Sequence, residues 1–288
     1  GGIKVRTANL NYVTCNMIAT TLSTSGVLLT TGITTVICKF VFGLTLAEGF
    51  LIGSVLSCTD AASVFAILRK HKLNLKDGTA SVLEVESGSN DPVSYMLTTI
   101  AISMLREGDS MNVMGLVVLQ LVFGVLIGVV MANISLFVMT KTKLISDGLD
   151  TIFMIAMVLV CYGIAGVVNG NAYLSLYLFG IMIGNSRIRN KQMLIPFFDG
   201  VTGLSQILIF FLIGLLSFPS QMPKIVPLAL AIVIALTIVA RPLAIFVLMA
   251  PFKCSIRQKL LISWAGLRGA SSSVFAIMAV AAGISVKQ

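Results

Sequence analysis

The sequence predicts an all-helical, polytopic membrane protein, and its composition and the length of its apolar stretches are the two observations that predict it. Of its 288 residues, 57% are hydrophobic and only 11% are charged, whereas a soluble domain carries roughly 25% charged residues. A chain of this length cannot enclose that much apolar side chain in one core, so most of it must face lipid. The composition therefore excludes a water-soluble enzyme, a nucleic-acid-binding domain and a disordered tail.

Stretches of about 20 mostly apolar residues, the length that crosses a bilayer, occur nine times between polar segments. The first stretch is rich in Thr and Ser, the sixth is short, and the second, third, eighth and ninth contain charged residues. The expected spans lie near 14–43, 46–68, 80–105, 113–139, 151–168, 173–185, 200–218, 225–250 and 258–283.

The distribution of Lys and Arg among the loops supports this number of spans and predicts their orientation. With nine spans, most basic loop residues fall on one side of the membrane, namely Lys4, Arg6, Arg69, Lys70, Lys72, Lys76, Lys141, Lys143, Arg187, Arg189, Lys191, Lys253, Arg257 and Lys259. The other side receives Arg106, Lys224 and Lys287. Since positively charged loops stay in the cytoplasm, the chain is expected to start inside and end outside. Lys39, near the end of a span, is expected to snorkel to the interface.

An internal repeat is visible when the chain is compared with itself at an offset of 210 residues. Leu51-Ile52 matches Leu261-Ile262, and Ser63–Ile67 matches Ser273–Ile277, which makes seven identities in 17 positions. The matching segments lie in the second and ninth spans, which cross the membrane in opposite directions. Inverted repeats with interrupted helices are a signature of secondary transporters. Chance identity among common apolar residues is the alternative.

Charged residues inside the expected spans are the strongest functional signal, because an ionised group at mid-depth costs several kcal/mol unless it is paired or wetted. These residues are the acids Asp60, Glu84, Glu86 and Asp91 and the cations Arg241 and Arg268. Structural ion pairs would explain some of them, but their clustering on four spans favours a functional site.

Helical spacing indicates which of these groups share a site. Ser87, Asn90 and Asp91 fall at positions i, i+3 and i+4 and line one face of the third span. Their oxygen atoms suit a dehydrated Na⁺ or K⁺, and the acid can alternatively take a proton. Interhelical hydrogen bonding is the other interpretation of Ser87 and Asn90. Glu86 points about a quarter turn away from Ser87, which leaves it free to pair with a cation on another helix.

Small and polar residues interrupt the second and ninth spans at corresponding places, Thr59-Asp60 and Gly266–Gly269. We expect breaks between half-helices there, with backbone ends closed by charged side chains. Asp60 would lie at the positive end of one half-helix and Arg268 at the negative end of another. Close packing at the glycines is the alternative.

Four motifs in order, over nearly the whole chain, resemble the NhaP-type monovalent cation:proton antiporters, and most of all the bacterial potassium/proton antiporters. The motifs are Ser57-Cys58-Thr59-Asp60-Ala61-Ala62, Leu83-Glu84-Val85-Glu86-Ser87-Gly88-Ser89-Asn90-Asp91-Pro92, Ala240-Arg241-Pro242-Leu243 and Ser263-Trp264-Ala265-Gly266-Leu267-Arg268-Gly269-Ala270. The resemblance implies a thirteen-helix inverted-repeat fold with broken helices. This chain would cover about the fourth to the twelfth helix, as a fragment of a longer protein.

The resemblance also implies how the fold is divided and with what it interacts. Residues 14–105 and 225–283 would form the core transport bundle, and 113–218 the linker and dimerisation helices. We expect a homodimer in the plasma membrane with elevator-like alternating access. The expected partners are the lipid bilayer, monovalent cations and protons, with no cofactor and no nucleic acid.

Carried over residue by residue, the resemblance implies two groups of site residues. The cation- and proton-binding group is Asp91, Asn90, Ser87 and Thr59. Glu86 and Arg241 resemble the family's structural ion pair. The Asn90-Asp91 order, in place of two adjacent aspartates, resembles electroneutral exchangers of one cation for one proton.

The predicted function is exchange of K⁺ or Na⁺ for a proton at Asp91, without enzymatic activity. Cation and proton would bind one carboxylate in turn, which couples their movements. An intramembrane aspartyl-type hydrolase is one alternative, but it would need Asp60 and Asp91 to share a proton in a GxGD setting, and the sequence has Ser89-Asn90-Asp91. A passive cation channel is the other, and it would more typically show rings of acids or a carbonyl filter.

Overall fold

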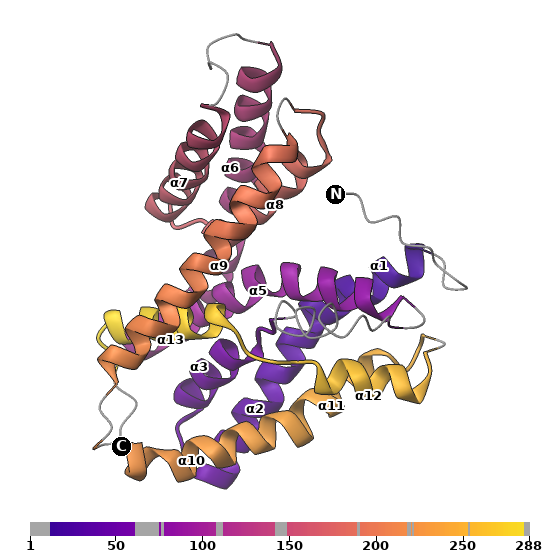
Figure 1. Cartoon of the computed structure of the whole chain (residues 1–288). Helices are drawn as coiled ribbons and strands as arrows, with labels where there is room; N and C mark the ends of the chain where they lie inside the picture. Colours follow the sequence, from indigo (N-terminus) through magenta and orange to yellow (C-terminus); the bar gives the residue numbers. More distant parts are fainter. Residues whose placement is uncertain are drawn as a thin grey trace. The chain divides into compact units, whose positions relative to one another are not determined.

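Every regular element that the computed structural model describes is a helix, and contacts divide the chain into two compact units (Figure 1). The described residues are 12–60, 75, 78–107, 112–141, 149–188, 191–217, 220, 222–252 and 254–284. The continuous unit is Asn112–Leu216, and the split unit contains the described residues before 112 and after 216. The transport and dimerisation roles expected for the two parts of the chain stay predictions.

The continuous unit contains four described helices, in which α6 packs against α7 and α8, and α7 packs against α8 and α9. They are α6 (Val113–Lys141), α7 (Asp150–Val167), α8 (Ala172–Asn185) and α9 (Lys191–Leu216). Ser175 on α8 donates its hydroxyl to the carbonyl oxygen of Gly124 on α6 at 2.9 Å. One turn further along α6, a Cβ on Gly128 would lie 2.6 Å from the carbonyl oxygen of Ser175. Glycine at 128 therefore allows the two backbones to touch.

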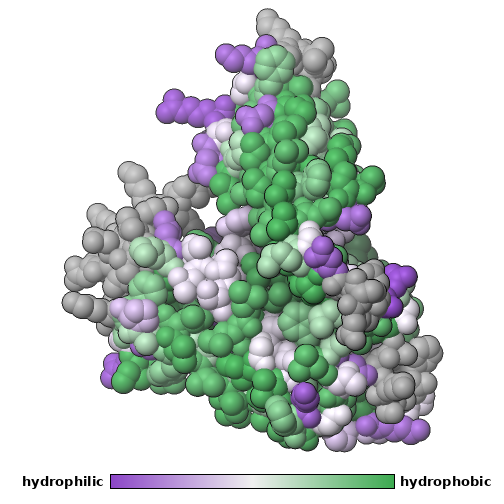
Figure 2. All heavy atoms as spheres, turned by 180° about the vertical axis from the view of Figure 1, so that it is seen from behind, coloured by the Kyte–Doolittle hydropathy of each residue, from purple (hydrophilic) through white to green (hydrophobic). Residues whose placement is uncertain are grey.

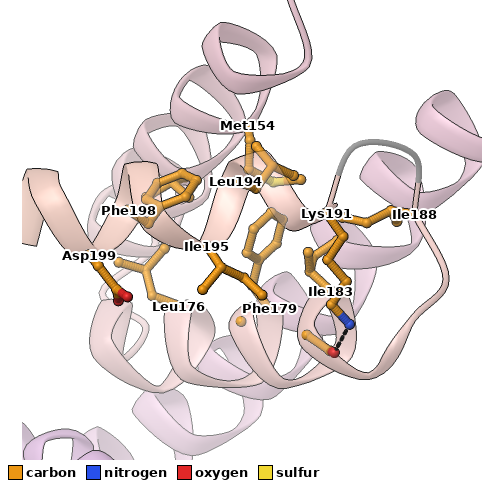
Figure 3. A pocket seen from close by; sticks show the side chains of 13 residues that line it. Met154, Leu176, Phe179, Ile183, Ile188, Lys191, Leu194, Ile195, Phe198 and Asp199 are labelled. Atoms are coloured by element: carbon orange, nitrogen blue, oxygen red, sulfur yellow. Dashed lines mark hydrogen bonds between the residues drawn. The ribbon is translucent and has the colours of Figure 1, made fainter. Parts of the chain in front are cut away.

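A mostly apolar cavity of about 400 Å³ lies among α7, α8 and α9 within this unit (Figure 3). Phe179 of α8 and Phe198 of α9 are among the side chains that line it. At its edge, the Nζ of Lys191 donates to the carbonyl oxygens of Gly184 and Ser186. The lysine therefore caps the negative end of α8, which is a favourable place for a cation.

The split unit begins with a long helix that contains a π turn, followed by a short helix packed against it. These elements are α1 (Tyr12–Thr21), η1 (Leu22–Gly26), α2 (Val27–Phe42) and α3 (Leu46–Ser57). Gly43 ends α2 in the left-handed conformation, with φ 68°. Thr45 and Glu48 then form a capping box, in which each side chain accepts a hydrogen bond from the other residue's backbone N–H. These local signals set the start of α3.

The central helix of the split unit is α5, which contacts α1, α3, α12 and α13. The remaining elements are α5 (Thr79–Glu107), α10 (Met222–Ala235), η3 (Leu236–Ala240), α11 (Arg241–Leu248), α12 (Ile256–Trp264) and α13 (Ala270–Ala281). The π turn η3 ends two residues before Pro242. Pro242 lacks an N–H, and its ring crowds the carbonyl one turn earlier. Ile18, Leu83, Ile245 and Ile262 belong to one buried apolar cluster that joins α1, α5, α11 and α12.

The second and ninth expected spans are not single helices. α3 ends at Ser57, and residues 58–60 after it are not helical. The ninth span is divided into α12 and α13, and Figure 1 shows the extended segment that joins them. Both interruptions occur where small and polar residues predicted them. Residues 61–68 of the second span lie outside the described residues, so the internal repeat stays a prediction.

Five helices among the described residues are long and apolar enough to cross a membrane, which is fewer than the nine spans expected. They are Cys15–Phe42, Val113–Lys141, Asp150–Val167, Lys191–Leu216 and Met222–Leu248. α5 has 29 residues but is too polar to count, and α3, α8 and α13 are shorter. The 14 residues of α8 extend about 21 Å, against a hydrocarbon core of about 30 Å. The exact number of spans and the thirteen-helix fold therefore stay predictions.

Large apolar side chains are exposed on both units, and green covers most of the face drawn in Figure 2. Examples are Phe40, which is 78% exposed, and Val167, which is 84% exposed. A water-facing surface does not normally expose apolar residues so continuously. The helices are therefore suited to contact with lipid and with other helices.

The contact at Gly128 generates a stability prediction. Gly128→Ala should destabilise the protein by about 1–3 kcal/mol, because the added methyl group meets backbone that cannot move aside easily. The apparent melting temperature of the purified protein in detergent, followed by intrinsic fluorescence, should fall by several degrees. Gly163→Ala on α7 is the matched control, since its Cβ would meet nothing within 4 Å. An equal melting temperature for both variants would contradict the close packing of α6 on α8.

Candidate functional site

The two interrupted segments of the split unit lie against each other. The backbone N–H of Asp60, just after α3, donates to the carbonyl oxygen of Leu267, between α12 and α13, at 2.8 Å. A Cβ built on Gly269 would overlap the carboxyl group of Asp60. No side chain fits at position 269 without moving Asp60, so glycine there allows the crossing. We call residues 58–60 and 265–269 together the crossing.

Charged side chains lie at the helix ends beside the crossing. Arg268 Nη1 donates to the carbonyl oxygens of Ser57 and Cys58, at 3.4 Å and 2.8 Å, where α3 ends. The carboxyl group of Asp60 lies against Gly269, the N-cap residue of α13. A cation thus meets the negative end of one helix dipole and an acid meets the positive end of another.

Ser87 and Asn90 of α5 both contact Thr59 in the crossing. Ser87 Oγ donates to the carbonyl oxygen of Thr59 at 3.0 Å. Asn90 Nδ2 donates to the same carbonyl at 3.3 Å and to Thr59 Oγ1 at 2.7 Å. Asn90 is fully buried, and its Oδ1 accepts no hydrogen bond from the described residues. These two residues therefore satisfy the backbone of the break, and an unbonded amide oxygen remains.

Asp91 lies beside the crossing but does not close its backbone. Its Oδ2 accepts a hydrogen bond from Ser271 Oγ, on α13, at 2.8 Å. The next residue, Ser272, has its Oγ 3.1 Å from Cys58 Sγ. The sequence did not predict a role for Ser271. The signal that could have found it is the run of three serines directly after the break at Gly269.

Glu86 and Arg241, which were expected to pair, lie 2.6 Å apart between Oε1 and Nη2. Their side chains are 1% and 3% exposed. The pair is joined by one hydrogen bond, since Glu86 Oε2 and Arg241 Nε have no partner in the described structure. A Cβ on Gly266 would lie 2.9 Å from Arg241 Nε, so the guanidinium packs directly on the α12–α13 link.

Two charged residues of the expected spans lie away from this site. Glu84 of α5 is exposed, so of the three acids expected inside this span only Glu86 and Asp91 belong to the site. Lys39 is exposed in the last turn of α2, with its Nζ 5.8 Å from the centre of the Phe40 ring. Its place at a helix end agrees with snorkelling.

A comparison with protein families identifies the family of the chain. The model of the family described as "Sodium/hydrogen exchanger, transmembrane" matches residues 6–288. The chain belongs to this exchanger family. The chain is therefore related to multi-pass membrane transporters and not to enzymes, which removes the hydrolase alternative.

Curated relatives confirm the resemblance to NhaP-type antiporters. The K(+)/H(+) antiporter NhaP of Alkalimonas amylolytica is 35% identical over 268 residues, which are 92% of this chain and 46% of the relative. The K(+)/H(+) antiporter NhaP2 of Shewanella baltica is 32% identical over 99% of this chain and 49% of the relative. This exchanger chain thus spans about half the length of the curated relatives it matches.

A solved structure shares the fold. The sodium proton antiporter MjNhaP1 from Methanocaldococcus jannaschii superposes with a TM-score of 0.80 at 20% identity, over 92% of this chain and 69% of that chain. At this identity the likeness concerns the fold alone. It supports a helical antiporter fold for the exchanger.

The buried pair generates a second prediction. Glu86→Ala or Arg241→Ala alone should destabilise the exchanger by about 3–5 kcal/mol, because each leaves an uncompensated buried charge. The double variant should lose clearly less than the sum of the two single losses. Melting temperatures of the four proteins in one detergent measure this coupling. Additive shifts would show that the two side chains do not stabilise each other.

Proposed function

We propose that this exchanger moves a monovalent cation and a proton in opposite directions across the membrane, with Asp91 as their shared binding group. The observation that carries the proposal is the hydrogen bond between Asp91 and Ser271 beside the crossing. It puts an ionisable carboxyl group where two interrupted helices meet. Family membership supports the reaction class, while the assignment to Asp91 is our inference.

Mutual exclusion at Asp91 would couple the two movements. An ionised carboxylate attracts a cation, whereas a protonated carboxyl group does not, so one group carries one or the other. The transporter would change its open side only when Asp91 is loaded. Exchange of one cation for one proton at a single carboxylate moves no net charge, so we propose electroneutral exchange by alternating access.

The crossing would provide the surroundings that a transported ion needs. Interrupted helices bring backbone and side-chain oxygens to mid-membrane depth without exposing them to lipid. Asn90, Ser87 and Thr59 are the polar neighbours we propose around Asp91. The Oδ1 of Asn90, which accepts no hydrogen bond from the described residues, is an oxygen that we propose for the cation.

The names of the relatives indicate which cations to test. NhaP of Alkalimonas amylolytica and NhaP2 of Shewanella baltica are named as K(+)/H(+) antiporters. NhaH of Halobacillus aidingensis, 27% identical over 83% of this chain, is named as a Na(+)/H(+) antiporter. We therefore propose K⁺ as the first cation to test and Na⁺ as the second.

The cellular setting follows from the same considerations. We propose a plasma-membrane protein in which the start of this chain lies on the cytoplasmic side. The expected loops on that side carry most of the basic residues, and such loops stay in the cytoplasm. We further propose a homodimer that needs no cofactor, with the ion gradient as the source of energy. The chain spans about half the length of its relatives, so we propose exchange for the whole protein and not for this region alone.

The first test replaces the proposed binding group. Asp91→Asn in the full-length protein should reduce exchange to background, because an amide can neither ionise nor carry a proton. The measurement is cation-driven proton flux in proteoliposomes, read with a pH-sensitive dye for K⁺ and Na⁺ separately. Glu84→Gln is the matched control, since this acid of the same helix is exposed, and it should retain exchange. Near-normal flux in Asp91→Asn would contradict the proposal.

The second test concerns competition. Because proton and cation would exclude each other at Asp91, the apparent KM for the cation should rise as pH falls, by about tenfold per pH unit once protonation dominates. The maximal rate should change little until release of the proton becomes limiting. Initial rates over a grid of pH and cation concentration measure this. A KM that is independent of pH would show that the two ions use separate sites.

A further inference from the structure

Ser87 and Asn90, which were expected to surround Asp91, donate their hydrogen bonds to another residue. Ser87 donates its hydroxyl hydrogen to the backbone of Thr59, and Asn90 donates its amide hydrogens to the same residue. The hydroxyl that contacts the carboxylate belongs to Ser271, on a different helix, at 2.8 Å. The structure thus provides a hydroxyl for Asp91 from α13 where the sequence indicated one from α5.

The geometry of this contact leaves Ser271 able to bind a cation. Its single hydroxyl hydrogen points to Asp91 Oδ2, so both lone pairs of its oxygen remain for other partners. Two oxygens 2.8 Å apart can both contact an ion of the size of Na⁺ at about 2.4 Å, the distance at which the similarly sized Ca²⁺ binds protein oxygens. The larger K⁺ can also contact both oxygens, at a longer distance. The Asp91 carboxylate and the Ser271 hydroxyl can therefore share one cation.

The electrostatics around this pair also permit a cation. Ser271 lies in the first turn of α13, whose positive helix end alone would repel one. Asp60 lies against the N-cap of that helix and offsets this charge. Arg268 is engaged with carbonyl oxygens at the end of α3, and Arg241 is paired with Glu86. Among the described residues, Cys58 is a further titratable group near Asp91.

We infer that Ser271 is a ligand of the transported cation and a positioning residue for Asp91. Its hydroxyl hydrogen fixes one carboxylate oxygen, and its lone pair completes the shell of the ion. This inference rests on the proposed exchange at Asp91. With Ser271 as a ligand, the half-helix α13 contacts the bound ion directly. Binding and release of the ion would therefore act on α13 as well as on α5.

Ser271→Ala in the full-length protein tests the inference. At alkaline pH, where protons compete least, the KM for the cation should rise about tenfold, because a hydrogen bond or ligand bond to a charged group contributes on this scale. The maximal rate should stay within about twofold. Ser271→Thr, which keeps the hydroxyl, should restore the wild-type KM. Ser271→Cys, which keeps the volume but offers a soft sulfur, should resemble Ser271→Ala.

A binding measurement without transport provides an independent readout. A bound cation stabilises the folded state by mass action, so the melting temperature of the purified protein should rise with K⁺ or Na⁺. The cation concentration at half-effect should be about tenfold higher in Ser271→Ala than in the wild type. Ser273→Ala is the matched control on the same half-helix, and it should keep the wild-type KM and the wild-type half-effect concentration.

The outcomes separate this inference from the proposed function. Full exchange in Asp91→Asn would overturn the function itself. With Asp91→Asn inactive, a wild-type KM and half-effect concentration in both Ser271→Ala and Ser271→Cys would overturn the role of Ser271. A loss of maximal rate and melting temperature at unchanged KM would also overturn it, because Ser271 would then be structural only.

Discussion

The structure of the split unit depends on satisfying the backbone where two helices stop inside an apolar protein. In hydrocarbon, each unpaired N–H or C=O group costs several kcal/mol, so a break can persist only when its groups have partners. Arg268 provides them for the end of α3, and Ser87 and Asn90 provide them for Thr59. The crossing is thus closed by a few side chains contributed by α5 and by the α12–α13 link.

The need to give buried polar groups a partner also explains why two acids of one helix differ in their burial and in their partners. Glu86 and Asp91 are five residues apart, which places them about 140° apart around α5. Glu86 faces Arg241 and is almost completely buried. Asp91 faces α13, is partly exposed, and does not help to close the break. One acid is therefore held as half of an ion pair, while the other is hydrogen-bonded to a neutral hydroxyl, as the proposed exchange at Asp91 requires.

Glycines determine how closely these parts approach. Gly269 gives Asp60 room against the start of α13, and Gly266 gives Arg241 room against the link. In both cases the neighbouring atom belongs to a charged side chain and not to an apolar one. The glycines therefore support the polar arrangement at the crossing, and a methyl group at either position would disturb the charges as well as the packing.

The sequence by itself determined the class of the protein and the two breaks, because an apolar composition indicates contact with lipid and small polar residues indicate interruptions. It also indicated that Glu86 needs a partner of opposite charge, but the choice of Arg241 as this partner rested on the resemblance to NhaP-type antiporters. The sequence indicated that the span at α8 is short, but it did not predict that α3 and α13 would be too short to count as full spans, because hydropathy continues through breaks. Only the tertiary structure decided which donor reaches which acceptor. Ser87 and Asn90 share a helix face with Asp91, yet they contact Thr59, and Ser271 contacts Asp91 from 180 residues away. Helical periodicity gives the direction of a side chain, but its partner depends on how separate helices pack, and one sequence without that packing does not contain this information.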